Sequence, residues 1–96
     1  MRITDHQKKA IISSIKTTDP DAKVWLFGSR VDDNKKGGDI DIAILSDEIN
    51  KDLIKKIKIK QQICDMIGDQ KIDIVTSSDG QEAIFKLAMS EGIELT

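Results

Sequence analysis

Two aspartates alternate with two isoleucines in the segment Asp39-Ile40-Asp41-Ile42. Successive side chains of a β-strand point to opposite faces of its sheet, so this alternation predicts a strand with both carboxylates on one face and both isoleucines in a core. The Cα atoms of the two aspartates would lie about 6.5 Å apart, which is two steps of strand rise. Two like charges this close on an apolar strand are costly unless a cation binds between them. A divalent metal ion is the simplest such cation.

A third carboxylate occurs in a similar setting. Asp73 lies within Lys71-Ile72-Asp73-Ile74-Val75, which has the same apolar–acid–apolar order and predicts another short strand. Three aspartates on neighbouring strands would form an oxygen-rich site, and oxygen ligands suit Mg²⁺ or Mn²⁺ rather than zinc. Taken alone, an acid in a strand commonly faces solvent, and this alternative stays open for Asp73.

A short polar turn follows the apolar run Val24-Trp25-Leu26-Phe27. In this turn Gly28 lets the backbone approach a ligand closely, the Ser29 hydroxyl and nearby N–H groups can hold phosphate oxygens, and Arg30 can pair with a phosphate. By itself the tripeptide also fits an ordinary turn with a serine helix cap. Combined with the two same-face aspartates, it predicts a phosphate-binding turn beside a metal site, which phosphoryl or nucleotidyl transfer requires.

Length and composition narrow the functional classes. The chain has 96 residues and a net charge of −2, which predicts a single domain over residues 1–96 with no general attraction to nucleic acid. No apolar run approaches the roughly 20 residues of a membrane span, and the first residues lack the apolar core of a signal peptide. The chain has one cysteine, Cys64, and one histidine, His6, which argues against a zinc site. A single cysteine cannot form an internal disulfide and fits a reducing cytoplasm.

The order of elements predicts an α/β (α+β) fold, a small mixed β-sheet flanked by helices. A capping box at Thr4 and Gln7 opens the first helix, and Asp19-Pro20 stops it. Strands are expected over about 23–27, 39–45 and 71–75, with a further edge strand near 93–95. One long helix is expected from Ser46 or Asp47 to Gly68, and another after a capping-box spacing at 78–81, ending at Gly92.

Two further expectations concern the helix faces. The long helix places one set of apolar side chains near one face: Leu53, Ile54, Ile57, Cys64 and Ile67. The last helix is expected to carry three inward: Ile84, Leu87 and Ala88. The stretch from Lys51 to Lys60 contains five lysines, which indicates a solvated helix face, with an acidic partner or RNA as the alternative.

The site residues also carry a family resemblance. The segment Phe27-Gly28-Ser29, a nine-residue gap and then Asp39-Ile40-Asp41-Ile42 resembles the signature of the DNA polymerase beta-type nucleotidyltransferase superfamily. Its continuation Gly28-Ser29-Arg30 resembles the smallest branch, the minimal nucleotidyltransferases. The resemblance covers nearly the whole chain and implies a polymerase beta-like nucleotidyltransferase fold.

The resemblance implies roles for individual residues. It implies that Asp39, Asp41 and Asp73 are catalytic and bind Mg²⁺ or Mn²⁺, and that Gly28 and Ser29 hold the phosphates of ATP or another nucleoside triphosphate. The chain departs from the pattern of the smallest branch after Arg30, where minimal members often continue Ala-Arg-Gly but Val31-Asp32-Asp33 stands here. It departs again at Gly38, where members often have serine before the first motif aspartate.

The resemblance also implies a partner. Minimal members commonly pair with a helical-bundle protein of the HEPN type (higher eukaryote and prokaryote nucleotide-binding). Some of these pairs act as toxin and antitoxin, and others are two-subunit nucleotidyltransferases. The leading hypothesis is therefore an Mg²⁺-dependent enzyme that transfers AMP from ATP, and self-association is an additional expectation.

Two other classes compete with this hypothesis. One is a non-catalytic, antitoxin-like protein that retains the fold and binds a partner; the costly pair Asp39 and Asp41 favours the enzyme instead. The other is a nucleic-acid-binding domain. The acidic net charge and the placing of Trp25 and Phe27 in a buried strand argue against it, because no stacking platform is then left.

Overall fold

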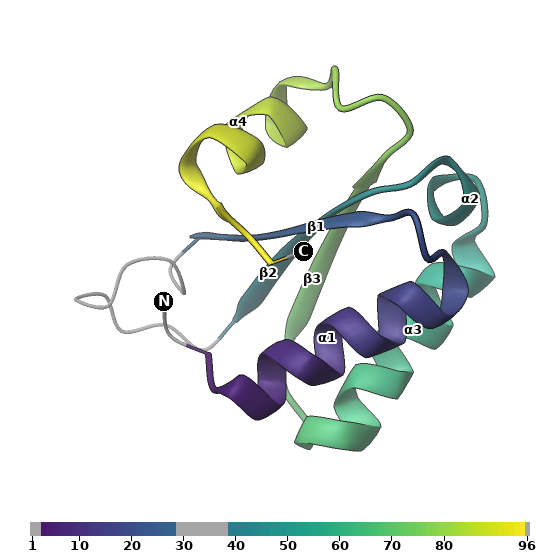
Figure 1. Cartoon of the computed structure of the whole chain (residues 1–96), viewed down its shortest axis with the longest axis vertical. Coiled ribbons are helices and arrows are strands. Elements are labelled where there is room, and N and C mark those ends of the chain that lie inside the picture. Colours follow the sequence, from purple (N-terminus) through teal and green to yellow (C-terminus); the bar gives the residue numbers. More distant parts are fainter. Residues whose placement is uncertain (1–2, 29–38, 96) are drawn as a thin grey trace.

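The structure is a computed structural model that describes residues 3–28 and 39–95 (Figure 1). Within this part of the chain, helices and strands follow in a mixed order: α1 (Asp5–Thr18), β1 (Lys23–Phe27), β2 (Ile40–Leu45), α2 (Asp47–Asn50), α3 (Leu53–Ile67), β3 (Ile72–Ser77), α4 (Ala83–Glu91) and β4 (Ile93–Glu94). No helix in these two ranges has the length and apolar character needed to cross a bilayer.

One mixed sheet organises the molecule, with the strand order β3-β2-β1-β4. Strand β1 is antiparallel to both β2 and β4, whereas β2 and β3 are parallel. A parallel pair needs a crossover connection, and here α2 and α3 provide it. The register sets Phe27 opposite Asp41 on one side of β2, and Asp73 opposite Asp41 on the other.

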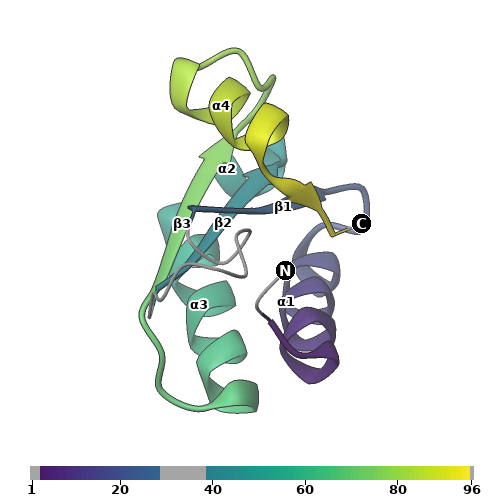
Figure 2. The same cartoon turned by 90° about the vertical axis from the view of Figure 1, so that its left-hand side faces the viewer.

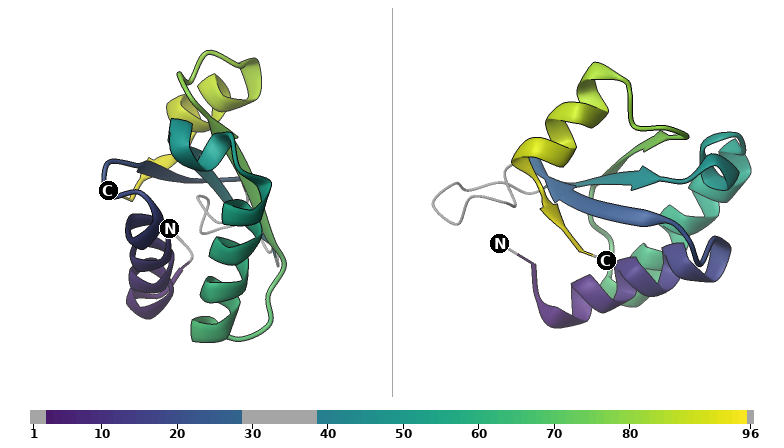
Figure 3. Two further views of the ribbon diagram at one scale, coloured as in Figure 1. Left: turned by 90° about the vertical axis from the view of Figure 1, so that its right-hand side faces the viewer. Right: turned by 45° about the horizontal axis from the view of Figure 1, so that its top comes forward.

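Helices α1 and α3 lie side by side on one face of the sheet, as Figures 2 and 3 show. The main core lies between this helix layer and the sheet. Alternate isoleucines of β2 enter it, because Ile40, Ile42 and Ile44 all point to this face and are fully buried. Val24 and Leu26 of β1 and Ile72 of β3 also belong to the sheet side of this core.

Helix α4 covers part of the opposite face (Figure 2). A second, smaller cluster joins it to the sheet through Trp25, Ala43, Phe85 and Ala88. The rings of Trp25 and Phe85 meet edge to face, with centroids 5.8 Å apart and planes at 81°. The alternation of β2 places Asp41 on this same face, two residues before Ala43. Asp41 is half-buried and Asp73 exposed, so α4 leaves the aspartate end of the face accessible.

Several sequence-based expectations about the elements are confirmed. The Thr4 side chain accepts a hydrogen bond from the Gln7 backbone N–H, and the Gln7 side chain accepts one from the Thr4 N–H, so the capping box of α1 is complete. Strand β1 has the predicted bounds. The expected edge strand near 93–95 is present as β4 and pairs with β1. A mixed sheet flanked by helices is the predicted fold class.

The expected long helix from 47 to 67 is wrong in one respect, because the chain forms two helices there. The short α2 is capped by Ser46 and ends at Asn50, with Lys51 as its C-cap. Asp52 then adopts an extended conformation, and its side chain accepts hydrogen bonds from the N–H groups of Ile54 and Lys55. A second N-cap therefore starts α3 afresh, as short polar side chains commonly do.

The predicted helix faces are also partly wrong. In α3, Ile59 and Ile63 are fully buried, while Leu53, Ile54 and Ile57 are exposed. Isoleucines and leucines occupy two overlapping stripes of this helix, so periodicity alone could not choose the inner one. Cys64 and Ile67 pack against the core as partly buried residues.

Helix α4 also differs from expectation, both in the side chains that it buries and in the residue at which it begins. Phe85 and Ala88 are buried, whereas Ile84 and Leu87 are about half exposed. The helix begins at Ala83 because the buried Ser77 side chain organises the preceding turn instead of a capping box. Its hydroxyl accepts hydrogen bonds from the N–H groups of residues 79 and 80 and donates one to a Glu82 carboxylate oxygen.

Candidate active site

Two aspartates meet on the accessible end of the sheet. Asp41 of β2 and Asp73 of β3 are direct partners in the parallel register, so their side chains leave the same face from adjacent strands. Their carboxyl groups are close enough to share a hydrogen bond. The buried neighbours Ile40 and Ile42, together with Ile72, fix this arrangement because their side chains fill the core on the opposite face.

Asp39 stands just before β2 and joins the same electrostatic cluster. It lies two residues before Asp41, and its negative charge acts on the Asp41 carboxyl group. One oxygen of Asp39 lies 3.5 Å from the Nζ atom of Lys71, which precedes β3. Both side chains of this ion pair are well exposed, so it contributes at most about 1 kcal/mol to stability. Lys71 therefore compensates the cluster weakly.

The pKa of Asp41 is raised above its ordinary value of 3.8. Partial burial is the main cause, followed by the negative charges of Asp73 and Asp39 and a hydrogen bond that the protonated Asp41 carboxyl group donates to Asp73, while Lys71 opposes the shift. Burial and like charges both disfavour an ionised carboxyl group. Among the described residues, Lys71 offsets this concentration of negative charge only weakly.

A glycine at the end of β1 makes room for Asp41. Gly28 has a φ of +75°, and a Cβ atom placed on it would lie 2.2 Å from an Asp41 carboxylate oxygen. No side chain fits in that space unless Asp41 moves. The glycine is therefore needed both for its left-handed backbone and for the close approach of the carboxylate.

Comparison with known proteins agrees with this geometry. The family model described as "Polymerase beta, Nucleotidyltransferase" matches residues 9–96, which is most of the chain. The chain belongs to the polymerase beta nucleotidyltransferase family. No curated protein matches it individually. Membership confirms the resemblance at the level of the superfamily and identifies the chain as a nucleotidyltransferase with the fold of that family.

The predicted site residues divide into two groups in this nucleotidyltransferase. Four of them are described: Gly28, Asp39, Asp41 and Asp73. The structure pairs Asp41 with Asp73 in register, places Gly28 against Asp41, and leaves Asp39 beside them, paired with Lys71. The other two, Ser29 and Arg30, lie outside the described residues, as do the departures from the family pattern at 31–33 and 38.

The carboxylates have a donor set that fits a hard divalent ion. No three His, Cys, Asp or Glu side chains within 3–28 and 39–95 are arranged to enclose a metal. A closed cage is not required, however, because Mg²⁺ usually binds through one or two carboxylates and takes its remaining ligands from water and substrate phosphates. Asp39 and Asp41, with Asp73 beside them, meet that requirement with oxygen donors and a local excess of negative charge among the described residues.

Lys71 is the site residue that sequence reasoning did not assign a role. Its signal was present, because it lies two residues before Asp73 and such spacing places both side chains on one face of a strand. Its contact with Asp39 links the start of β3 to the start of β2. The strand pattern alone predicts that Lys71 lies on the same face as Asp73. Its pairing with Asp39 depends on β3 lying next to β2, which the pattern does not predict.

The Gly28→Ala substitution tests the close approach at Asp41. We expect the new methyl group to push the Asp41 carboxylate aside, so that stabilisation by Mn²⁺ in thermal unfolding is lost. Gly68→Ala is the matched control, because Gly68 also has a positive φ, of +91°, but nothing lies within 4 Å of the position that its new methyl group would take. Both variants should lose roughly 1–3 kcal/mol through backbone strain. Equal metal responses in the two variants would contradict the role assigned to Gly28.

The raised pKa of Asp41 predicts a pH-dependent difference in stability. As pH rises above about 3.8, the unfolded state releases the Asp41 proton first, while the folded state holds it until its higher pKa is reached. The contribution of Asp41 to the free energy of unfolding therefore falls over that interval. Without metal, Asp41→Asn should be more stable than the wild type at neutral pH, and the difference should shrink towards about pH 4. Urea unfolding in EDTA measures it; a constant difference would contradict the prediction.

Proposed function

We propose that this nucleotidyltransferase is Mg²⁺-dependent and transfers AMP from ATP to a hydroxyl group on a partner protein. The observation that carries the proposal is the paired register of Asp41 and Asp73, with Asp39 alongside. Family membership supports nucleotidyl transfer, and the cluster of three carboxylates supports a divalent metal. We assign the partner to the HEPN-type helical bundles that the resemblance implies, in a toxin–antitoxin pair or a two-subunit enzyme.

In the proposed reaction, the acceptor oxygen attacks the α-phosphorus of ATP. A new P–O bond forms, the bond from the α-phosphorus to the bridging oxygen breaks, and pyrophosphate leaves with the electron pair. Asp39 and Asp41 would hold Mg²⁺, which orients the triphosphate and stabilises the charge that develops on it. Asp73 lies exposed at the edge of the sheet, where it can accept the proton of the incoming hydroxyl group.

The proposal is tested by incubating the chain with labelled ATP, Mg²⁺ and the protein encoded by the neighbouring gene. Labelled AMP should become attached to that protein, and EDTA should prevent it. Parallel reactions with the other three nucleotides identify the preferred substrate. If no nucleotide labels the partner although the two proteins form a complex, the enzyme proposal fails and the non-catalytic, partner-binding alternative stands.

Metal binding can be measured without the reaction. Mg²⁺ or Mn²⁺ should raise the melting temperature, because a ligand that binds only the folded state stabilises it by RT ln(1 + [L]/Kd), which is about 2.7 kcal/mol at 100 times Kd. In the Asp41→Asn variant the metal should no longer raise the melting temperature, because the site has lost one carboxylate and its negative charge. An unchanged response in the variant would place the metal elsewhere.

A further inference from the structure

Three large apolar side chains project into solvent from the first turns of α3. Leu53, Ile54 and Ile57 are 68%, 63% and 58% exposed. Their spacing of one and then three residues places them along one side of the helix. Single exposed apolar residues are ordinary on protein surfaces, but a contiguous group marks a site of interaction.

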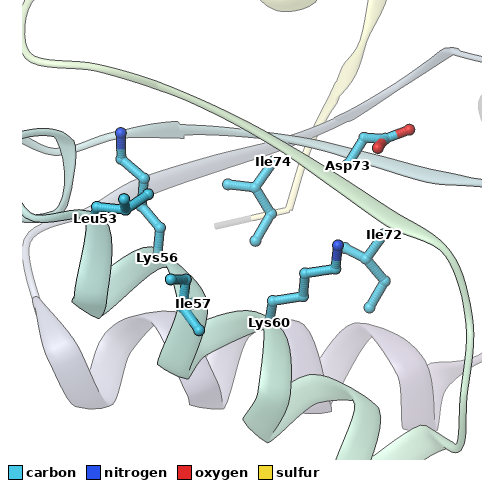
Figure 4. A pocket seen from close by; sticks show the side chains of 7 residues that line it. All are labelled: Leu53, Lys56, Ile57, Lys60, Ile72, Asp73 and Ile74. Carbon is cyan, nitrogen blue, oxygen red and sulfur yellow. The ribbon is translucent and has the colours of Figure 1, made fainter.

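This stripe borders a groove between α3 and β3, with a volume of about 300 Å³. We call it the α3–β3 groove; its lining comprises Leu53, Lys56, Ile57, Lys60, Ile72, Asp73 and Ile74. Figure 4 shows the two lysine side chains extending from α3 beside the apolar ones. Strand β3 is at the edge of the sheet, and no described strand pairs with its outer side. The groove therefore lies open on the flank of the molecule.

Lys56 and Lys60 outnumber the single acid of the groove, Asp73, by two to one. Lys51 and Lys55 both contact Glu48, at 3.6 and 2.6 Å. By contrast, Lys56 and Lys60 form no ion pair with any residue in 3–28 or 39–95. An apolar floor next to two unpaired lysines would be complemented by a surface that is both apolar and acidic.

We propose that the α3–β3 groove is the docking surface for an amphipathic, acidic helix of a second polypeptide. The apolar stripe on α3 suits a helix, because side chains spaced along one helix pack between those of another. Glutamates or aspartates flanking the apolar face of the incoming helix would pair with Lys56 and Lys60. A two-fold dimer through this groove would instead bring both copies of this lysine pair into one interface, and RNA would leave Leu53 and Ile57 without apolar contacts.

The groove and the acidic cluster share one residue, Asp73. Asp73 is among the residues that line the groove, and it is also the register partner of Asp41 on the neighbouring strand β2. A polypeptide seated in the groove would therefore have neighbouring residues within reach of the acidic cluster. We infer that the docked polypeptide is also the acceptor of the nucleotide. This step rests on the proposed function, whereas docking itself does not.

The test uses the full chain and the protein encoded by the neighbouring gene, with affinity measured by calorimetry. Leu53→Asp and Ile57→Asp should each weaken binding at least 10-fold, while remaining folded because both side chains are exposed. Ile84→Asp and Leu87→Asp are matched controls on α4, where exposure is 52% and 50%, and should bind normally. Lys56→Glu with Lys60→Glu should also weaken binding at least 10-fold, whereas Lys86→Glu should not.

Several outcomes would overturn docking at this groove. One is the absence of any complex, and another is loss of binding in the α4 variants instead of the α3 variants. A third is a dimer of the chain alone that Ile57→Asp dissociates. The last is an RNA oligonucleotide that binds more tightly than the protein partner and whose binding Lys56→Glu abolishes. Transfer provides a separate readout. If the α3 variants lose binding but Asp41→Asn binds the partner normally and the wild type transfers nothing to it, docking stands and the proposed function fails.

Discussion

Asp39→Asn and Asp41→Asn should each reduce nucleotide transfer by at least about 1,000-fold. Each substitution removes one charged oxygen donor from the site that would hold Mg²⁺, and the lost stabilisation of charge on the triphosphate is several kcal/mol, at about 1.4 kcal/mol for each factor of ten in rate. Single-turnover rates with labelled ATP at saturating Mg²⁺ measure the effect. Ser29→Ala should cost far less, because one neutral hydrogen bond contributes roughly 0.5–1.5 kcal/mol.

The control for these variants is Asp69→Asn, which removes an exposed carboxylate outside the acidic cluster and should leave the rate unchanged. Partner binding should survive in all of them, since none alters the core. Transfer that persists within about tenfold of the wild type in both Asp39→Asn and Asp41→Asn would show that the chemistry occurs elsewhere.

Phe85→Ala should lower the free energy of unfolding by about 3–5 kcal/mol, the usual range for removing a buried phenylalanine. Phe85 is fully buried and makes the edge-to-face contact that joins α4 to Trp25 on the sheet. A small domain has a total stability on the order of 5–15 kcal/mol, so this loss would leave α4 loosely attached or the chain largely unfolded at 37 °C. Urea unfolding with far-ultraviolet circular dichroism gives the magnitude.

Leu87→Ala is the matched control in the same helix. The Leu87 side chain is half exposed, so its removal should lower the free energy of unfolding by less than about 1 kcal/mol. Trp25 is the single tryptophan of the chain, so its emission reports directly on the contact with Phe85. A Phe85→Ala variant with unchanged stability and emission would show that α4 is held by other contacts.

Alternation and caps made much of the fold predictable. The strands around Leu26 and Ile42 were predicted because alternating or continuous apolar residues next to a glycine leave few other solutions. The first helix was predicted because Thr4 and Gln7 satisfy its free N–H groups. The break at Asp52 was missed, since a cap inside a helical pattern competes with continuation and the outcome depends on packing.

The faces of α3 and α4 show where sequence reasoning ends. Both helices carry more apolar residues than one buried stripe can hold, and the sequence offers no measure of which stripe meets the sheet. The structure selects Ile59 and Ile63 in α3, and Phe85 in α4. The apolar residues left outside, Leu53 and Ile57 among them, then become candidates for contact with another molecule.

The candidate site was predictable in its carboxylates but not in its contacts. Alternation placed Asp39 and Asp41 on one face, and the same apolar–acid–apolar order, supported by the resemblance, added Asp73. That Asp73 would pair directly with Asp41 depended on strand order and register, which long-range pairing determines and a local pattern does not. The approach of Gly28 to Asp41 depended on the same pairing.

The pairing of β2 with β3 also links correct folding to activity. Side chains alternate along a strand, so a slip of one residue would bring Asp73 towards the helices α1 and α3 and expel Ile72 and Ile74 from the core. Such a misaligned sheet would bury a charge and lose apolar contacts, besides having its third carboxylate on the wrong side. Molecules with a misaligned β3 would therefore be both inactive and unstable. They would unfold readily and could then refold with the correct register.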